Sequence, residues 1–176
     1  SIVFQPGDPA LLLALLKNPL VQIGADPETH KSQTMWLERL VLRGGVGRFS
    51  MIDFAGFATN QISKLKRDDG YKPDWVKGLL AKDEIQAVEI AQRLQDAFEP
   101  LTALTAESGS VSLEAALKAS VLVFEALTKN ELADHSPLYA DEAGTMLRTA
   151  LTQFMASESG LMFEASQWPE IMRAIT

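Results

Sequence analysis

Residues that could bind an anion are concentrated in one glycine-rich stretch, Arg43-Gly44-Gly45-Val46-Gly47-Arg48. Free backbone amides between two arginines can hold an anion. The stretch lacks the Gly-Lys-Ser/Thr ending with which a phosphate-binding loop surrounds its phosphates. Glycine is also the ordinary residue at the end of a helix. We therefore favour a helix end followed by a turn over an anion site.

Three acidic pairs are the only candidates for a metal-dependent nuclease site: Asp68-Asp69, Asp83-Glu84 and Asp141-Glu142. Such a site needs carboxylates and a lysine placed to hold the ion and activate water. No pair lies near an acid-x-Lys string, and each falls at an expected turn or helix start, where acids are common. The sequence therefore predicts solvated helix ends and no metal site.

The two histidines, His30 and His135, are far apart in sequence, and the chain has no cysteine that could join them in a zinc site. The string Asp134-His135-Ser136 contains the residue types of a hydrolytic triad, but sequence neighbours seldom point at one another as a triad requires. Ser136, before Pro137, is better interpreted as a helix cap. We predict no catalytic residue.

Basic residues offer one further kind of chemistry, contact with a phosphate backbone. Lys64, Lys66 and Arg67 end an expected helix, and Lys72 and Lys77 follow. Tyr71 and Trp75 lie among them and could stack on a base. A solvated helix end with one core tryptophan is the alternative. The residues that we single out for nucleic-acid contact are Arg39, Arg43, Arg48, Lys64, Lys66 and Arg67.

Helix signals position these residues. Asp8 caps and Pro9 opens a leucine-rich helix that Asn18-Pro19 ends. Its leucines cover most of its faces, so we expect it to be buried centrally. Asp26-Pro27-Glu28 repeats the start signal, for a helix to about Arg43. Ser50 begins a third helix, which ends at the cations Lys64, Lys66 and Arg67.

Later helices follow from apolar spacing. We expect a short helix from Pro73 and a long one to about Phe98, which Pro100 limits. A flexible connection over 102–110 follows, then helices from Ser112 and over 143–155, and a last one from Trp168. The expected buried stripes include Trp36, Leu37, Leu40 and Val41; Met51, Phe54, Ala58 and Ile62; Ile85, Val88, Ala91, Leu94 and Phe98; Leu113, Leu117, Val121, Phe124 and Leu127; and Ala143, Met146, Leu147, Ala150, Leu151, Phe154 and Met155.

These patterns predict an all-α fold: one irregular bundle of about seven or eight helices over 1–176, with no sheet. Residues 1–7 have no methionine and contain Ile2, Val3 and Phe4, so we expect a connecting segment from a longer parent chain. The net charge is +3 up to Lys82 and −10 from Asp83, so only the first half suits a polyanion. The absence of cysteine fits a cytoplasmic protein, and no apolar run is long enough to span a bilayer.

Three stretches resemble the alphaproteobacterial form of AddB, a subunit of the AddAB helicase–nucleases. These enzymes belong to the UvrD/RecB-like helicases. The first is Leu12 to Gly24, with its leucine-rich helix and Lys-Asn-Pro-Leu end. The second is Leu37 to Gly44, similar to that family's LE-x-x-x-LRG. The third is Trp168 to Ala174, similar to the helix that ends its helical insert. Their order and separation fit along nearly all of the chain.

The resemblance implies a non-catalytic helical accessory domain that acts in double-strand-break repair and recombination, supporting DNA passage and subunit packing. It implies no enzymatic activity in this fragment. Its parent would be an ATP-dependent helicase and deoxyribonuclease subunit. ATP, Mg²⁺ and an iron–sulfur cluster would belong to the parent complex. Partners would be the rest of the AddB-like subunit, an AddA-like subunit and, weakly, DNA, with no membrane.

Two other functions stay open. One is a stand-alone all-α protein-interaction module with no DNA role, whose likeness to AddB is chance. The other is a small-ligand enzyme or sensor with a pocket between its helices. No convergence of polar residues in the sequence supports the second.

Overall fold

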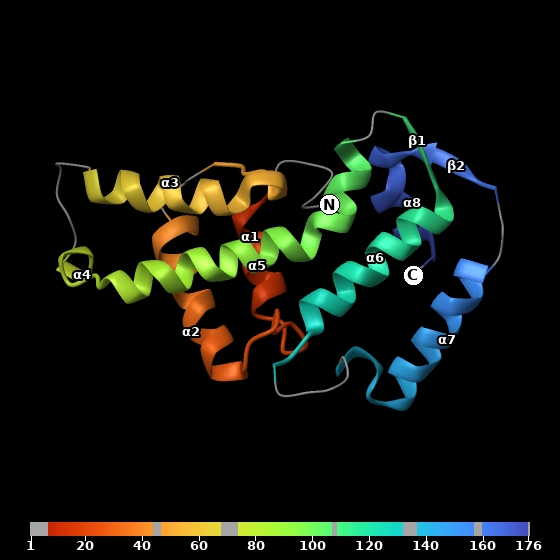
Figure 1. The fold of residues 1–176 in the computed structure, drawn as a ribbon, viewed down its shortest axis with the longest axis horizontal. Coiled ribbons are helices and arrows are strands. Elements are labelled where there is room, and N and C mark those ends of the chain that lie inside the picture. The colour runs from red at the N-terminus through yellow and green to blue at the C-terminus, as the bar shows by residue number, and fades with distance from the viewer. Residues whose placement is uncertain are drawn as a thin grey trace.

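The fold was obtained as a computed structural model, which describes residues 7–43, 47–67, 74–106, 109–131, 137–156 and 160–175. These residues form the α-helices α1 (Pro9–Leu16), α2 (Pro27–Leu37), α3 (Phe54–Arg67), α4 (Asp74–Lys77), α5 (Ala81–Ala106), α6 (Leu113–Thr128), α7 (Glu142–Ala156) and α8 (Trp168–Ile175). Short 3-10 turns cover Met51–Asp53, Pro137–Tyr139 and Ala165–Gln167. The all-α class predicted from the sequence is confirmed (Figure 1).

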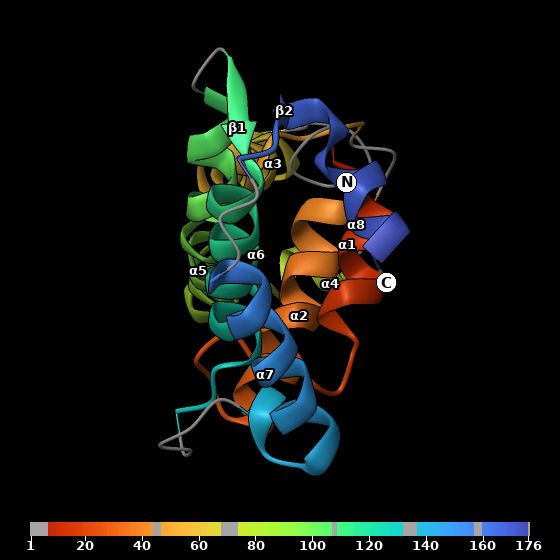
Figure 2. The ribbon, with the colours of Figure 1, turned by 90° about the vertical axis from the view of Figure 1, so that its right-hand side faces the viewer.

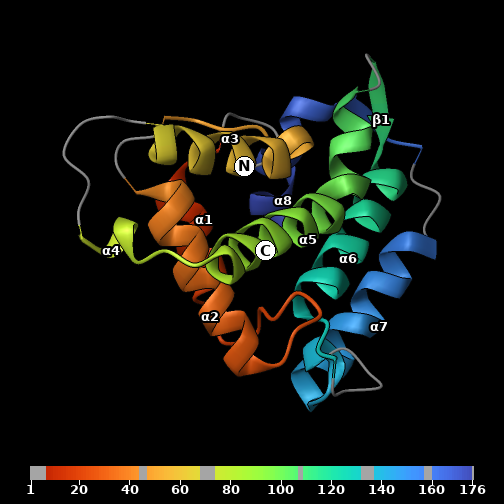
Figure 3. The same ribbon diagram turned by 60° about the vertical axis from the view of Figure 1, so that its left-hand side comes forward.

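Helix α5 is the centre of the fold. Its contacts with α2, α3 and α6 are the most extensive between any two elements, and it runs across the molecule between them (Figures 1 and 3). Its buried stripe consists of Ala87, Ile90, Ala91, Leu94, Ala97, Phe98 and Leu101. Val88 is half-buried, but Ile85 is exposed, so the predicted stripe was wrong at Ile85.

Pro100 lies inside α5, so the prediction that it limits this helix was wrong. Proline removes one intrahelical hydrogen bond and bends a helix. Figure 1 shows α5 changing direction toward its C-terminal end. The helix continues because Leu101 and Thr102 are buried against the core, and packing of this kind overrides local propensity. The flexible connection expected over 102–110 is therefore mostly helix and strand among the residues described there.

The first helix has the predicted cap but not the predicted burial. The Asp8 carboxylate accepts a hydrogen bond from the amide of Ala10 at 2.8 Å, and α1 ends at Leu16, before Asn18-Pro19. Only Leu12 and Leu16 are fully buried, while Leu11 is 54% exposed. The expectation of a centrally buried helix was wrong, because α1 lies at the periphery and packs on the body by one side (Figure 2).

Helix α2 continues into one π-helical turn, Glu38–Leu42, so the helical segment reaches almost to Arg43 as predicted. Leu37, Leu40 and Val41 are buried, and Trp36 is half-buried. The 3-10 turn Met51–Asp53, which leads into α3, begins with the expected cap, in which the Ser50 hydroxyl accepts from the amide of Ile52 at 3.2 Å.

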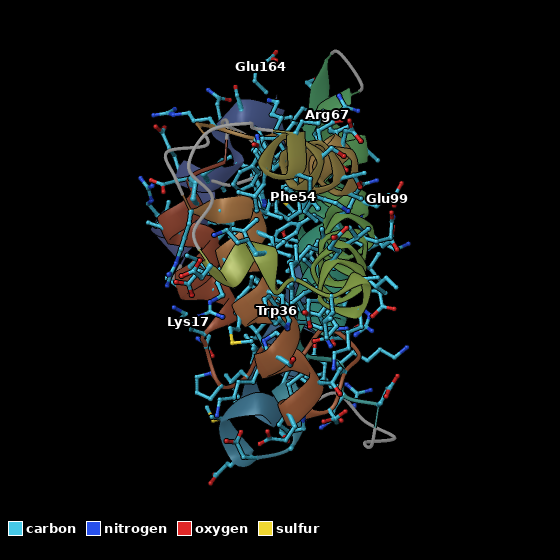
Figure 4. All side chains as sticks on the ribbon, turned by 90° about the vertical axis from the view of Figure 1, so that its left-hand side faces the viewer. Lys17, Trp36, Phe54, Arg67, Glu99 and Glu164 are labelled. Carbon is cyan, nitrogen blue, oxygen red and sulfur yellow. The ribbon has the colours of Figure 1, made fainter. Side chains whose placement is uncertain are left out.

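Aromatic rings fill the space behind this cap. The ring centroids of Phe49 and Phe54 are 4.7 Å apart, and both side chains are buried. Figure 4 shows Phe54 toward the middle of the molecule, with Lys17 and Glu99 on opposite sides. Gly7, the last residue of the expected connecting segment, donates its amide to the carbonyl of Phe49 at 2.7 Å. That end of the segment is thus bound to the core.

A small antiparallel sheet joins the two ends of the C-terminal half, contrary to the prediction of no sheet. Strand β1 (Ser110–Ser112) pairs with β2 (Met162–Glu164), with Val111 opposite Phe163. Strands of three residues carry too little periodicity to be found in a sequence. The Trp168 indole N–H donates to the Ser120 hydroxyl at 2.9 Å, which attaches α8 to α6.

Helices α6 and α7 run side by side (Figures 1 and 3), and most of the described side chains of α7 are exposed. In α6, the half-exposed Val121 and exposed Phe124 lie outside the buried face, which Ala116, Leu117, Ser120, Val123 and Leu127 form. In α7, Gly144 is buried and Leu151 half-buried, while Ala143, Met146, Leu147 and Ala150 are exposed. The buried stripe predicted for α7 was therefore wrong at these four residues; the side chains of Phe154 and Met155 lie outside the described part.

Candidate nucleic-acid interface

All six basic side chains predicted to contact nucleic acid are exposed. The C-terminal end of α3 positions Lys64, Lys66 and Arg67, and the π-helical turn and its end position Arg39 and Arg43. The last turn of α3 favours cations because the helix dipole is negative there. Figure 4 places Arg67 at one end of the molecule, away from Lys17 and Trp36.

Arg43 is already paired. Its Nη2 atom lies 2.9 Å from Oε1 of Glu38, and Lys17 Nζ lies 2.9 Å from Oε2 of the same carboxylate. Hydrogen bonds from Lys17 and then from Arg43 hold the pKa of Glu38 below its usual value. The π-helical turn makes the Glu38–Arg43 pair, because its i to i+5 bond, from the amide of Arg43 to the carbonyl of Glu38, brings these residues onto one side.

Lys66 is paired as well. Its ammonium group lies 3.0 and 3.1 Å from the two carboxylate oxygens of Glu84, so it joins α3 to the start of α5. The pair crosses a surface groove of about 330 Å³ lined by Thr59, Ile62, Ser63, Lys66, Arg67, Glu84 and Val88. A phosphate entering this groove would have to compete with Glu84, which weakens the groove as an anion site.

Arg39 stacks on an aromatic ring. Its guanidinium carbon lies 5.7 Å from the centroid of Trp36, within the range of a cation–π interaction. Among the ion pairs between described residues, none involves Arg48, Lys64 or Arg67. Of the six predicted cations, these three are therefore not engaged by a carboxylate within the described part of the chain.

Several predictions concern residues outside the described part. They include Gly44-Gly45 and Val46 of the glycine-rich stretch, Asp68-Asp69, Tyr71, Lys72, Asp134-His135-Ser136 and the side chain of Trp75. Gly47 is described and has a φ of 77°, a conformation that favours glycine. Lys77 forms an exposed ion pair with Asp74 at 2.9 Å.

The other acidic pairs have structural roles. Asp83 is buried, and its carboxylate accepts from the amide of Leu80 at 3.0 Å at the start of α5. Asp141 accepts from the amide of Gly144 at 2.7 Å and caps α7. Both are helix-start acids, as predicted, although Asp83 is not solvated. Within the described ranges, no group of three or more acidic or histidine side chains could hold a metal ion.

Sequence reasoning missed a cavity of about 500 Å³ between the end of α1, the turn that follows it, and α2. His30 lies in its wall; the side chain is 8% exposed, and its Nε2–H donates to the carbonyl of Leu16 at 2.8 Å. The lining residues come from three separate segments, so no local sequence pattern could predict the cavity. The only signal was a histidine on a helix otherwise rich in polar residues.

The comparisons with known proteins leave the family open. No family model, no curated protein and no solved structure matches the chain. Among the residues that the structure describes, no helix combines the length and the apolar character that crossing a bilayer requires.

Proposed function

We propose that this chain is a non-catalytic helical accessory domain of an AddB-like helicase–nuclease subunit, acting in DNA double-strand-break repair. It would support the passage of DNA and the packing of the subunits. The observation that carries the proposal is that each of the three AddB-like stretches holds together elements that are distant in sequence.

The first stretch caps α6. The turn after α1 donates the amides of Gln22 and Ile23 to the carbonyl of Leu127, at 2.9 and 3.0 Å, and that of Gly24 to Lys129 at 2.7 Å. These carbonyls are among those that a helix end leaves without partners. The stretch therefore joins α1 to α6, as a scaffold motif would.

The second and third stretches have similar roles. In the second, Leu37, Leu40 and Val41 enter the core, while Glu38 binds both Arg43 and Lys17. In the third, Trp168 is buried and donates to Ser120 of α6. Residues that hold a fold together fit a structural insert whose parent carries the chemistry.

The DNA part of the proposal depends on Arg48, Lys64 and Arg67. Because Arg43 and Lys66 are engaged by carboxylates, we expect DNA binding to be weak and strongly dependent on salt. The exposed apolar edge of α7 would pack against the rest of the AddB-like subunit.

The test uses the 176-residue chain. We expect no ATPase and no nuclease activity above buffer, and DNA binding that the double reversal Lys64→Glu/Arg67→Glu weakens about tenfold. The matched control for total charge is Lys118→Glu/Lys129→Glu, at an exposed residue of α6 and at the exposed residue that follows its end, and it should weaken binding less. ATP turnover, or tight binding that both double reversals reduce equally, would contradict the proposal.

The second candidate is a stand-alone all-α protein-interaction module without a DNA role. The observation that favours it is the neutralisation of Arg43 and Lys66 by Glu38 and Glu84. The genomic reading frame separates the two candidates. Continuation past Thr176 into helicase-like strands supports the accessory domain, and a self-contained frame supports the module.

A further inference from the structure

An ion pair joins Lys66, in the last turn of α3, to Glu84, in the first turn of α5. The ammonium group lies 3.0 and 3.1 Å from the two carboxylate oxygens, so both oxygens of Glu84 accept from one cation. The two helix ends lie at the same end of the molecule (Figure 1). The side chain of Lys66 is 56% exposed and that of Glu84 is 24% exposed, so the lysine faces solvent more than the carboxylate does.

The position of the Glu84 carboxylate does not depend on Lys66 alone. Glu84 lies in the first turn of α5, where the helix dipole stabilises a negative charge. The start of this helix is fixed, because the buried Asp83 accepts from the amide of Leu80 and because α5 packs extensively on α3. Glu84 therefore presents two anionic oxygens to Lys66, as the two unesterified oxygens of a phosphodiester would.

Two more cations end α3 beside this pair. Arg67 lines the same groove as Lys66 and Glu84. Lys64 and Arg67 are three residues apart and so lie on one side of the helix. Among the ion pairs between described residues, Glu84 pairs with Lys66 and not with these two. The carboxylate thus engages one of the three cations with which this helix end could meet a phosphate backbone.

We propose that Glu84 is an autoinhibitory residue, whose carboxylate holds Lys66 in place of a nucleic-acid phosphate and keeps DNA binding at this end of α3 weak. The inference rests on the proposed function, because it assigns a regulation to the same candidate interface. A phosphate that approaches Lys66 meets the negative charge of Glu84, which repels it. Loss of this charge removes the repulsion and makes Lys66 available to the phosphate.

The experiment neutralises Glu84 in the 176-residue chain. Glu84→Gln keeps the shape of the side chain and removes its charge. By fluorescence anisotropy of a labelled DNA duplex, we expect this variant to bind about fivefold more tightly than the unaltered chain at about 100 mM salt. The slope of log affinity against log salt concentration should become steeper by about 0.9, the value for one additional phosphate contact.

Two control variants separate the local effect from net charge. Glu99→Gln removes the same charge from an exposed residue of α5, about 22 Å further along the helix at 1.5 Å per residue. This distance exceeds the screening length of about 10 Å at 0.1 M salt, so affinity should change less than about twofold. Lys66→Gln/Glu84→Gln removes the whole pair without changing the net charge and should bind DNA as the unaltered chain does. Circular dichroism checks that all three variants keep their helices.

Three outcomes would overturn the inference and leave the proposed function standing, provided that Lys64→Glu/Arg67→Glu weakens binding. Equal tightening by Glu84→Gln and Glu99→Gln would assign the effect to net charge. A double variant that binds as tightly as Glu84→Gln would show that Lys66 is not the cation released. A double variant that binds more weakly than the unaltered chain would show that Lys66 contacts DNA despite Glu84. No DNA binding by any variant, Glu84→Gln included, would overturn both proposals.

Discussion

Helices α2 and α7 differ in burial, and the difference is the opposite of what their compositions predict. Between Pro27 and Leu37, α2 is mostly polar, yet Gln33 is 1% exposed and Thr34 is buried. In α7 the apolar residues recur at regular helical spacings, yet Met146 is 68% exposed.

Hydrogen bonds to α5 explain the burial of α2. Gln33 donates to Glu89 at 3.0 Å and accepts from Arg93 at 3.3 Å, and the Ser32 hydroxyl donates to Gln86 at 2.6 Å. A polar side chain is buried at little cost when its groups find partners. In α7, by contrast, the tight packing given for Gly144 is against the backbone of Leu138 and Tyr139. An amphipathic pattern therefore shows which side of a helix can be buried. Only the contacts with other elements show which side is buried.

The largest difference should come from removing equal leucines on the two helices. Leu37→Ala in α2 deletes a side chain with no exposed surface and leaves a cavity, which we expect to cost about 3 kcal/mol of unfolding free energy. Leu147→Ala in α7, where the side chain is exposed, should cost about 0.5 kcal/mol. Urea unfolding of both variants checks this. Equal losses would mean that α7 is covered in solution.

A smaller effect is expected where α7 is attached. A Cβ atom at Gly144 would collide with the backbone carbonyl of Leu138, which cannot move aside as a side chain can. Alanine normally favours a helix over glycine, but here we expect Gly144→Ala to destabilise the contact by about 1–3 kcal/mol. Hydrogen exchange should rise in α7 while α2 stays protected. Unchanged protection in α7 would show that the helix shifts to accept the methyl group.

The sequence predicted the fold class and most helix starts because these depend on local chemistry. Asp8, Asp26 and Ser50 cap helices as expected, since a cap needs only a side chain and the amides that follow. It failed where distant packing decides. Pro100 is accommodated because Leu101 packs on the core, and α1 is peripheral although it is rich in leucine.

For the candidate interface, the sequence indicated which basic side chains are exposed. It did not indicate which of them are paired with carboxylates. The exposure of the six cations followed from their positions at helix ends and loops. The engagement of Lys66 by Glu84 did not, because eighteen residues separate the two and only the packing of α3 on α5 joins them. The pairing of Arg43 with Glu38 needs a π-helical turn, for which the sequence carries no recognised signal.

The attachment of α8 to α6 gives a third test, with a smaller expected loss of stability, of what holds a helix in place. Trp168→Phe keeps an aromatic ring near Phe163, whose centroid lies 5.6 Å from that of Trp168, but removes the indole N–H that binds Ser120. Ser120 keeps its own bond to the carbonyl of Ala116 at 2.9 Å, so we expect a loss of about 1 kcal/mol by urea unfolding. Ser120→Ala should therefore cost less in the Trp168→Phe background than in the unaltered chain. Equal costs in the two backgrounds would contradict the shared hydrogen bond.

The smallest effect concerns the carboxylate at the end of the α2 segment. Lys17 and Arg43 lower the pKa of Glu38 in the folded chain, so the stability that this group contributes is present above its unfolded pKa, about 4.3. It is lost as the pH falls through the lower folded value, when the carboxylate takes up a proton. Because both cations are exposed, we expect less than about 1 kcal/mol. Glu38→Gln should remove this contribution at pH 7 and make the pH dependence of unfolding between pH 3 and 5, the window around that pKa, shallower. Glu28→Gln, in the first turn of α2, is the matched control, and an equal flattening there would assign the effect to net charge instead of to the Glu38 pairs.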